Sequence, residues 1–243
     1  MLSVIVPTYN EAGALPILVN RLLGALEGCG FDFELVIVDD NSPDGTGLVA
    51  DDLARDHPIH VIHRPRKAGL ASAVLDGLAV ARGDLIGVMD ADLSHPPEVI
   101  PVMVRALEEG GVDLAVGSRY VKDGAIEDWP WRRKIVSVLA NLMTRWLIPV
   151  KDATSGFFVI RRAAIDGVEL NPIGFKIGLE VMARACYQSY AEIPYVFTDR
   201  KHGTSKFGPS EVCSFLKQLA ILYWKFGLRP SRSRVQRTRQ PRL

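Results

Sequence analysis

The chain has 243 residues, of which 48% are hydrophobic and 23% are charged, and its formal net charge is +1. This composition excludes a disordered or fibrous protein and is typical of one globular domain with a substantial core. The charge is uneven, because residues 229–243 contain six arginines and no acidic residue, which leaves the body with 23 basic and 28 acidic residues.

Short apolar strands alternate with helical stretches along the first 120 residues, which predicts a parallel sheet covered by helices. The predicted strands of this half are 2–8, 33–40, 59–64, 84–90 and 113–119. The predicted helices are 14–26, 45–55, 70–81 and 97–110. Gly83 is expected to cap the third helix. Ligands of such sheets gather at the carboxyl ends of the strands, so we expect the site at that edge.

After Arg119 the pattern changes to a polar loop. The elements predicted beyond this loop are a helix at 135–150, a strand at 156–162, a helix at 178–188 and a strand at 190–200. We therefore expect one domain, residues 1–228, made of a nucleotide-like front half, 1–119, and an acceptor-side back half, 120–228.

Two amphipathic segments, 135–150 and 212–228, are interrupted by basic residues and are too short to span a bilayer. The second leads into the basic tail, a combination expected of a helix that lies on a membrane surface; a core-packing helix is the alternative. The tail itself, 229–243, is expected to be disordered. We expect it to meet a membrane rather than nucleic acid.

The strand at 84–90 ends in two carboxylates, Asp90 and Asp92. As a bare tripeptide, "DAD" is explained by a capping turn before a helix at Pro97, with Asp92 or Ser94 as the N-cap. No glycine-rich phosphate loop follows any strand, so a bound diphosphate needs another neutralising group. A divalent cation on these two carboxylates would serve, because magnesium is commonly held by one or two carboxylates plus substrate phosphates.

Polar side chains also follow the first two strands. The ring of Tyr9 can stack on a base, and a carboxylate such as Asp40 can accept ribose hydroxyls. Taken singly, each is as well explained by turn chemistry.

Seven motifs in order, "IVPTYNE", "IVDDNSPDGT", "MDADLSHPPE", "VGSRY", "DATSGFFVIRR", "GFKIGLE" and "RKHGTSK", closely resemble the polyprenol-phosphate (dolichol-phosphate) mannosyltransferases of glycosyltransferase family 2. The resemblance covers about residues 2–226. It implies an α/β fold of the GT-A type, a Rossmann-like and mostly parallel sheet, with a C-terminal amphipathic helix and a basic tail. It also implies inverting transfer of mannose from GDP-mannose to a polyprenyl phosphate, with Mg²⁺ or Mn²⁺ as cofactor.

The resemblance also assigns roles by motif. The residues implied to bind the nucleotide sugar are Pro7, Tyr9, Glu11, Val38, Asp40, Asp90, Ala91, Asp92, Arg119, Arg200 and Lys206. Those implied to be catalytic are Asp92, Arg119 and Arg200, and those implied to hold the acceptor phosphate are Arg119 and Arg133. The metal would be held by Asp90, Asp92 and Ser94, although many relatives carry Gln where Ser94 stands.

The chemistry predicts that no general base is needed, because a lipid phosphate is already largely ionised near pH 7 and can attack unaided. Cations that bring two anions together are needed instead. Arg132, Arg133 and Lys134 stand beside Trp129 and Trp131, a grouping suited to a membrane interface. A solvated loop with both indoles packed inward is the alternative.

Three widely spaced cysteines, Cys29, Cys186 and Cys213, fit a reducing compartment. We therefore expect a peripheral protein on the cytoplasmic face of the membrane, with a small membrane-anchoring protein as a further partner. A donor such as UDP-glucose or another UDP-sugar, and a relative that binds nucleotide sugar without turnover, stay open. A polysaccharide synthase is disfavoured, because Leu142 replaces the Gln of the Q-x-x-R-W motif.

Overall fold

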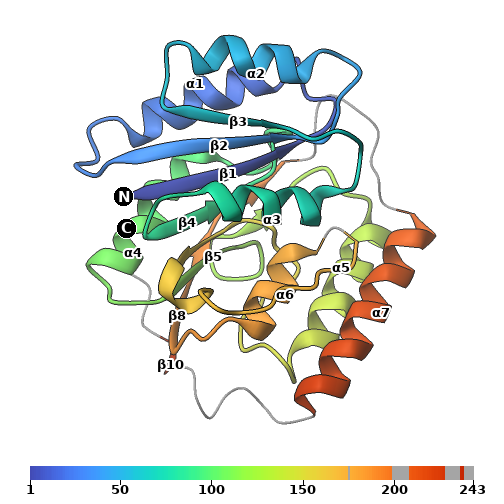
Figure 1. Ribbon diagram of the computed structural model, residues 1–243. Helices are drawn as coiled ribbons and strands as arrows, with labels where there is room; N and C mark the ends of the chain where they lie inside the picture. Colours follow the sequence, from blue (N-terminus) through green and yellow to red (C-terminus); the bar gives the residue numbers. More distant parts are fainter. Residues whose placement is uncertain (175, 199–207, 228–235, 238–243) are drawn as a thin grey trace.

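The computed structural model describes residues 1–174, 176–198, 208–227 and 236–237. In these ranges, an eight-stranded sheet of order β10-β8-β5-β7-β4-β1-β2-β3 forms the centre of the molecule (Figure 1). Its strands are β1 Leu2–Thr8, β2 Phe33–Asp39, β3 Ile59–His63, β4 Leu85–Val88, β5 Leu114–Ser118, β7 Phe158–Arg161, β8 Ser189–Pro194 and β10 Gln236–Arg237. Strand β7 runs antiparallel to β4 and β5, and the other pairs are parallel, so the predicted mostly parallel α/β fold is confirmed.

Helices cover both faces of this sheet. They are α1 Leu15–Leu26, α2 Thr46–Ala54, α3 Leu70–Val80, α4 Ile100–Glu108, α5 Trp131–Thr144, α6 Ile177–Arg184 and α7 Pro209–Phe226, with short 3-10 turns at Pro97–Val99 and Arg162–Ala164. One core cluster joins the sheet to α1, α2 and α4, and a second joins it to α3, α6 and α7. All seven residues of β1 are buried, as expected for a strand between two helical layers.

Glycine is needed at position 83 for a different reason from the predicted helix cap. Helix α3 ends at Val80, and the N–H of Ala81 donates to the carbonyl of Gly77, so Gly83 is not the cap. A Cβ atom at residue 83 would lie 2.6 Å from the backbone nitrogen of Ser3. Glycine is therefore required by the close approach of this turn to β1.

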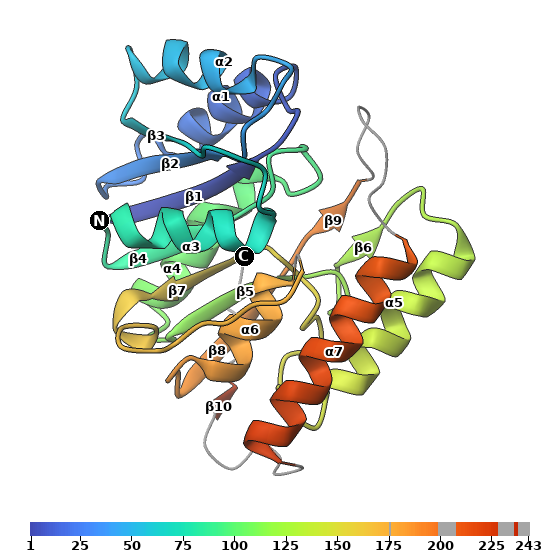
Figure 2. The ribbon, with the colours of Figure 1, turned by 45° about the vertical axis from the view of Figure 1, so that its right-hand side comes forward.

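Helix α5 begins at Trp131, four residues before its predicted start, because the residues after Pro130 already form helical hydrogen bonds. The three basic residues at 132–134 therefore belong to the first turn of a helix and not to a loop. Helices α5 and α7 lie side by side at one end of the molecule (Figures 1 and 2), where the Tyr223 hydroxyl donates to the carbonyl of Met143 at 2.5 Å.

The basic tail contributes one short strand. Gln236–Arg237 forms β10 and pairs in parallel with Ser189 and Tyr190 of β8, while disorder of the tail stays a prediction. An edge strand offers unpaired backbone groups, which explains the pairing. The other tail residues lie outside the described ranges. Within those ranges, no helix combines the length and the apolarity needed to cross a bilayer.

A second, two-stranded parallel sheet lies beside the main one. It pairs β6, Ala125–Ile126, with β9, Val196–Phe197. This pairing brings the segment that precedes α5 next to the end of β8.

Candidate active site

A cavity of about 650 Å³ opens at the carboxyl ends of β1 and β4 and extends between α3, α5 and α7. Ten of the residues predicted to bind the substrates or the metal line it: Pro7, Tyr9, Glu11, Asp40, Asp90, Ala91, Asp92, Ser94, Arg119 and Arg133. Val38 does not line it, because its side chain is fully buried next to Gly77 of α3. Arg200 and Lys206 lie outside the described residues.

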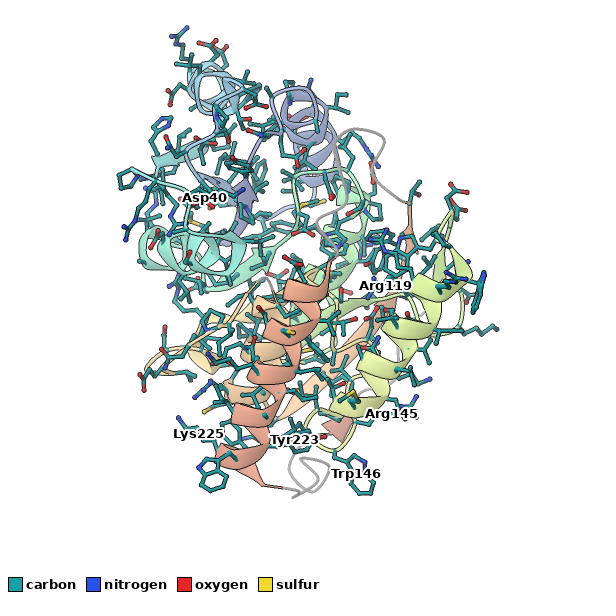
Figure 3. The ribbon with its side chains drawn as sticks, turned by 90° about the vertical axis from the view of Figure 1, so that its right-hand side faces the viewer. Asp40, Arg119, Arg145, Trp146, Tyr223 and Lys225 are labelled. Carbon is teal, nitrogen blue, oxygen red and sulfur yellow. The ribbon has the colours of Figure 1, made fainter. Side chains whose placement is uncertain are left out.

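Asp40, labelled in Figure 3, accepts hydrogen bonds from the loop between β3 and α3, beside the cavity. One carboxylate oxygen accepts hydrogen bonds from Arg64 at 2.6 Å and from the N–H of Ala68 at 2.9 Å, and the other accepts from the N–H of Gly69 at 2.8 Å. In the same loop, the Lys67 ammonium lies 3.7 Å from the centroid of the Tyr9 ring. Asp40 therefore shapes the wall beside Tyr9, and its direct contact with a ribose stays a prediction.

The turn after β4 presents the two carboxylates. One oxygen of Asp92 accepts hydrogen bonds from the hydroxyl of Ser94 at 2.6 Å and from its N–H at 3.1 Å. Leu93 between them has φ +64°, a left-handed conformation that is uncommon for leucine. No side chain caps the 3-10 turn that starts at Pro97, so the capping interpretation of Asp92 and Ser94 is wrong.

His95 holds this turn from behind, a role that the sequence reasoning missed although the residue stands inside "DADLSHPPE". Its Nδ1 accepts a hydrogen bond from the N–H of Asp90 at 3.1 Å, and its ring stacks on Phe157 with centroids 4.9 Å apart. Burial lowers the pKa of His95 despite the opposing charges of Asp90 and Asp92. The imidazole is therefore neutral, with its proton on Nε2.

Arg119 forms a buried ion pair with Asp152, which the sequence reasoning also missed. Its Nε and Nη2 donate to the two carboxylate oxygens at 2.7 and 2.8 Å, and its backbone N–H donates at 3.0 Å. Burial lowers the pKa of Arg119, but the charge and hydrogen bonds of Asp152 outweigh it and raise that pKa above its ordinary value. The guanidinium at the cavity wall is thus a fixed positive charge. The signal in the sequence was the "DATSG" motif, which begins at Asp152.

Lys176 is a further cation of the cavity wall. Its ammonium donates to the carbonyl of Thr154 at 3.1 Å. Burial, and next the charge of Arg119, lower the pKa of Lys176 to about 8, while Asp152 and Asp90 oppose this change. The side chain is therefore mainly charged at pH 7 and is poised to meet an anion.

Trp129, just before α5, and Trp131, its first residue, have different environments. Trp129 packs inward against Phe197, with ring centroids 5.2 Å apart, and the Arg133 guanidinium lies 3.9 Å from the Trp129 centroid. Trp131 is 65% exposed. The prediction that both indoles face a membrane interface is therefore wrong for Trp129, which belongs to the cavity wall together with Arg133.

The far part of the cavity is apolar. Its wall is made by side chains of α5 and α7: Val136, Leu139, Ala140, Met143, Val212, Phe215 and Leu216. One continuous space thus joins a polar end, with carboxylates and cations, to an apolar end between two helices.

The chemistry of the donor atoms fits a divalent cation. Asp90 and Asp92 offer hard carboxylate oxygens in the cavity, while the hydroxyl of Ser94 is bonded to Asp92. Among the described residues, no group of three or more His, Cys, Asp or Glu side chains is arranged to hold a metal by itself. Two carboxylates suit magnesium or manganese that takes its remaining ligands from substrate phosphates and water.

Residues 3–168 match the model of a protein family described as glycosyl transferase family 2. The chain is 44% identical over 228 residues to a dolichol-phosphate mannosyltransferase of Pyrococcus furiosus, covering 92% of this chain and 64% of that protein. It is 40% identical over 221 residues to a polyprenol monophosphomannose synthase of Mycolicibacterium smegmatis, covering 86% and 82%. The chain thus spans slightly less than two thirds of the Pyrococcus protein.

Solved structures share the fold at low identity. A glucosyl-3-phosphoglycerate synthase from Mycobacterium tuberculosis, in complex with Mn²⁺, UDP and glucosyl-3-phosphoglycerate, matches with a TM-score of 0.65 and 20% identity over 95% of this chain and 81% of that one. A mannosyltransferase from Pyrobaculum calidifontis, in complex with GDP-Man and Mn²⁺, matches with a TM-score of 0.62 and 18% identity over 93% and 67%.

Proposed function

The chain belongs to glycosyl transferase family 2, and we propose that it transfers mannose from GDP-mannose to a polyprenyl phosphate. An oxygen of the acceptor phosphate forms the new bond to the anomeric carbon, the bond from that carbon to GDP breaks, and GDP leaves with the electron pair. Attack from the face opposite the departing GDP inverts the configuration at that carbon. The similarity to a dolichol-phosphate mannosyltransferase and a polyprenol monophosphomannose synthase supports this choice of sugar and acceptor.

The shape of the cavity is the observation that carries the proposal. Its polar end holds Asp90, Asp92 and Arg133, and its apolar end is walled by α5 and α7. A soluble sugar acceptor has no hydrocarbon group that could bind in the apolar end. A prenyl phosphate carries an anion on a hydrocarbon chain and matches both ends.

Positioning and charge supply the catalysis. A phosphate monoester is largely ionised at pH 7, so no side chain has to remove a proton from it. Arg133 and Lys176 draw the acceptor phosphate toward the donor diphosphate, and Arg119, fixed by Asp152, keeps positive charge beside both anions.

Asp90 and Asp92 would hold the divalent cation, with Ser94 restraining Asp92 through its 2.6 Å hydrogen bond. A bound Mg²⁺ or Mn²⁺ would supply Lewis-acid stabilisation of negative charge on the diphosphate. The His95 side chain accepts a hydrogen bond from the backbone N–H of Asp90, and the Ser94 hydroxyl donates to the carboxylate of Asp92, so both residues of the turn are held in place.

A membrane surface is the proposed location, because a polyprenyl acceptor resides in the bilayer. Exposed apolar residues of α5 recur every three or four positions, as in an interfacial helix: Trp131, Ile135, Val138 and Leu142. Trp224 near the end of α7 is 93% exposed. Figure 3 shows Trp146 and Arg145 after α5 on the same side of the molecule as Lys225 of α7, a pairing of indoles with cations typical of headgroup level.

The cytoplasmic face is the proposed side of that membrane, and a small anchoring protein is a further proposed partner. The free thiols of Cys186 and Cys213 are exposed, which is compatible with a reducing compartment.

One assay tests donor, acceptor and metal together. The purified chain is given radiolabelled GDP-mannose or UDP-glucose with a polyprenyl phosphate in liposomes, with Mg²⁺, with Mn²⁺ or with a chelator. We expect labelled lipid from GDP-mannose alone, no product with chelator, and a β-linked mannose by NMR of the product. The Arg133→Ala variant should raise the KM for the lipid phosphate more than the KM for GDP-mannose.

The contrary outcomes are distinct. Labelled lipid from UDP-glucose alone would mean that UDP-glucose, and not GDP-mannose, is the donor. Tight nucleotide binding without transfer would mean that the chain is a binding protein and not an enzyme. Unchanged flotation with liposomes after Trp224→Ala and removal of residues 229–243 would count against the membrane face.

A further inference from the structure

Resting on the proposed function, we propose that Trp129 is a positioning residue for the acceptor, because its indole holds the guanidinium of Arg133 toward the cavity. The acceptor phosphate would then meet an arginine that is already oriented when it arrives. Nothing in the sequence distinguished Trp129 from its neighbour Trp131 in this respect.

The contacts of Trp129 place it between two cations. The guanidinium carbon of Arg133 lies 3.9 Å from the ring centroid of Trp129, and that of Arg119 lies 5.6 Å from it. Both distances are within the range of cation–π attraction, and tryptophan is the most effective aromatic partner. One indole therefore fixes the distance between the arginine of the buried ion pair and the arginine at the acceptor side.

The indole is in turn held by the small β6–β9 sheet. Its ring packs edge to face on Phe197, with centroids 5.2 Å apart, and the N–H of Glu127 donates to the carbonyl of Phe197 at 2.9 Å. Phe197 also meets the edge of His95, with centroids 6.1 Å apart. A continuous row of rings therefore joins the turn that carries Asp90 to Arg133, and sets the separation of donor and acceptor charges.

The choice of tryptophan supports this role. The indole N–H of Trp129 is buried and has no hydrogen-bond partner among the described residues. An unpaired buried donor costs free energy that phenylalanine at this position would avoid. The electron-rich indole face, on which Arg133 lies, is reproduced in part by phenylalanine and not at all by leucine.

The test compares Trp129→Phe, which keeps an aromatic face, with Trp129→Leu, which keeps apolar bulk but loses that face. With geranyl phosphate as a soluble acceptor, we expect Trp129→Leu to raise the KM for acceptor about tenfold and to leave the KM for GDP-mannose within about twofold, whereas Trp129→Phe loses much less. In the Arg133→Ala background, Trp129→Leu should cause no further loss, because the group on which Trp129 acts is gone. Equal losses in the Leu and Phe variants, or additive losses in the double variant, would overturn the proposal.

Trp131→Leu is the matched control. The guanidinium carbon of Arg132 lies 5.4 Å from the ring centroid of Trp131, an analogous cation–π pair, but Trp131 is exposed and does not line the cavity. This variant should leave the KM for geranyl phosphate unchanged. Two measurements separate the two proposals. Absence of mannosyl transfer by the unmodified chain contradicts the proposed function. Calorimetric binding of geranyl phosphate and of GDP tests Trp129, because equal weakening of both ligands in Trp129→Leu contradicts its role.

Discussion

The two edges of the central sheet bury charge in opposite ways. At the amino edge, the buried carboxylate of Glu34 accepts hydrogen bonds from the Ser3 hydroxyl at 2.6 Å, from the Arg82 N–H at 2.7 Å and from the Arg82 guanidinium at 2.6 and 2.8 Å. At the carboxyl edge, Asp90 and Asp92 line a cavity of about 650 Å³. A carboxylate thus completes a closed network at one edge and lines a cavity at the other.

This difference assigns separate tasks to the two edges. A closed network stabilises the fold, because each polar group has replaced its water by a protein partner. Carboxylates that share a cavity repel one another and cost stability, which is acceptable where a cation and an anion bind. Substitutions at the amino edge should therefore change stability, and those at the carboxyl edge should change activity.

Asp92→Asn should have the largest effect. It removes one of two carboxylates at the proposed metal site while keeping the shape and the turn, so kcat should fall by more than about 10³-fold. The melting temperature should stay the same or rise, because repulsion with Asp90 is relieved. Radiolabel transfer and thermal unfolding measure the two effects, and undiminished transfer would remove Asp92 from the metal site.

Glu34→Gln should show the reverse pattern. The charge-assisted hydrogen bonds with Arg82 are lost. We expect the free energy of unfolding to fall by about 2 kcal/mol and not more, because the Arg82 side chain is largely exposed and water screens part of its charge. The kcat/KM well below the melting temperature should not change. Glu98→Gln, which breaks an exposed pair with Arg21, is the control and should cost less than about 1 kcal/mol. Equal costs would mean that burial of Glu34 adds nothing.

The acid dependence of stability should follow Glu34 as well. Burial tends to raise the pKa of Glu34, but its hydrogen bonds with Ser3 and Arg82, and the charge of Arg82, lower that pKa below 4.5. The folded-state pKa is thus below the unfolded one, so the stabilisation is complete above about pH 4.5 and is lost as pH falls through the folded-state pKa. Denaturant unfolding between pH 3 and 6 should show a shallower loss in Glu34→Gln than in the unmodified protein, and identical slopes would contradict this assignment.

Ser94→Ala should give the smallest effect. It removes one hydrogen bond to Asp92, worth about 1 kcal/mol, so kcat/KM should fall about fivefold. A loss of a hundredfold or more, reversed by raising the Mn²⁺ concentration, would instead mean that Ser94 binds the metal directly.

The convergence of the candidate site residues on one edge of the sheet could be predicted for a local reason. Tyr9, Asp40 and Asp90 each follow a strand, and parallel strands deliver their carboxyl ends to the same edge. Their convergence on one cavity could be predicted without any contact between distant residues.

The partners of those residues could not be predicted in this way. Asp152 pairs with Arg119, which is 33 residues away in the chain. His95 follows β4 and stacks on Phe157, which immediately precedes β7; the two rings meet because β7 lies between β4 and β5 in the sheet. An antiparallel strand in a parallel sheet leaves the local apolar pattern unchanged, so no periodicity reveals it.

The amino-acid sequence by itself determined the alternation of strands and helices, the edge that carries the site and the family resemblance, because these depend on residues close together in the chain. Tertiary structure alone decided that Trp129 packs inward under Arg133 while Trp131 faces outward, and that Asp40 holds the loop of Lys67. Two tryptophans separated by one proline have the same local pattern, and only the position of Phe197 on β9 gives one of them a surface to pack against.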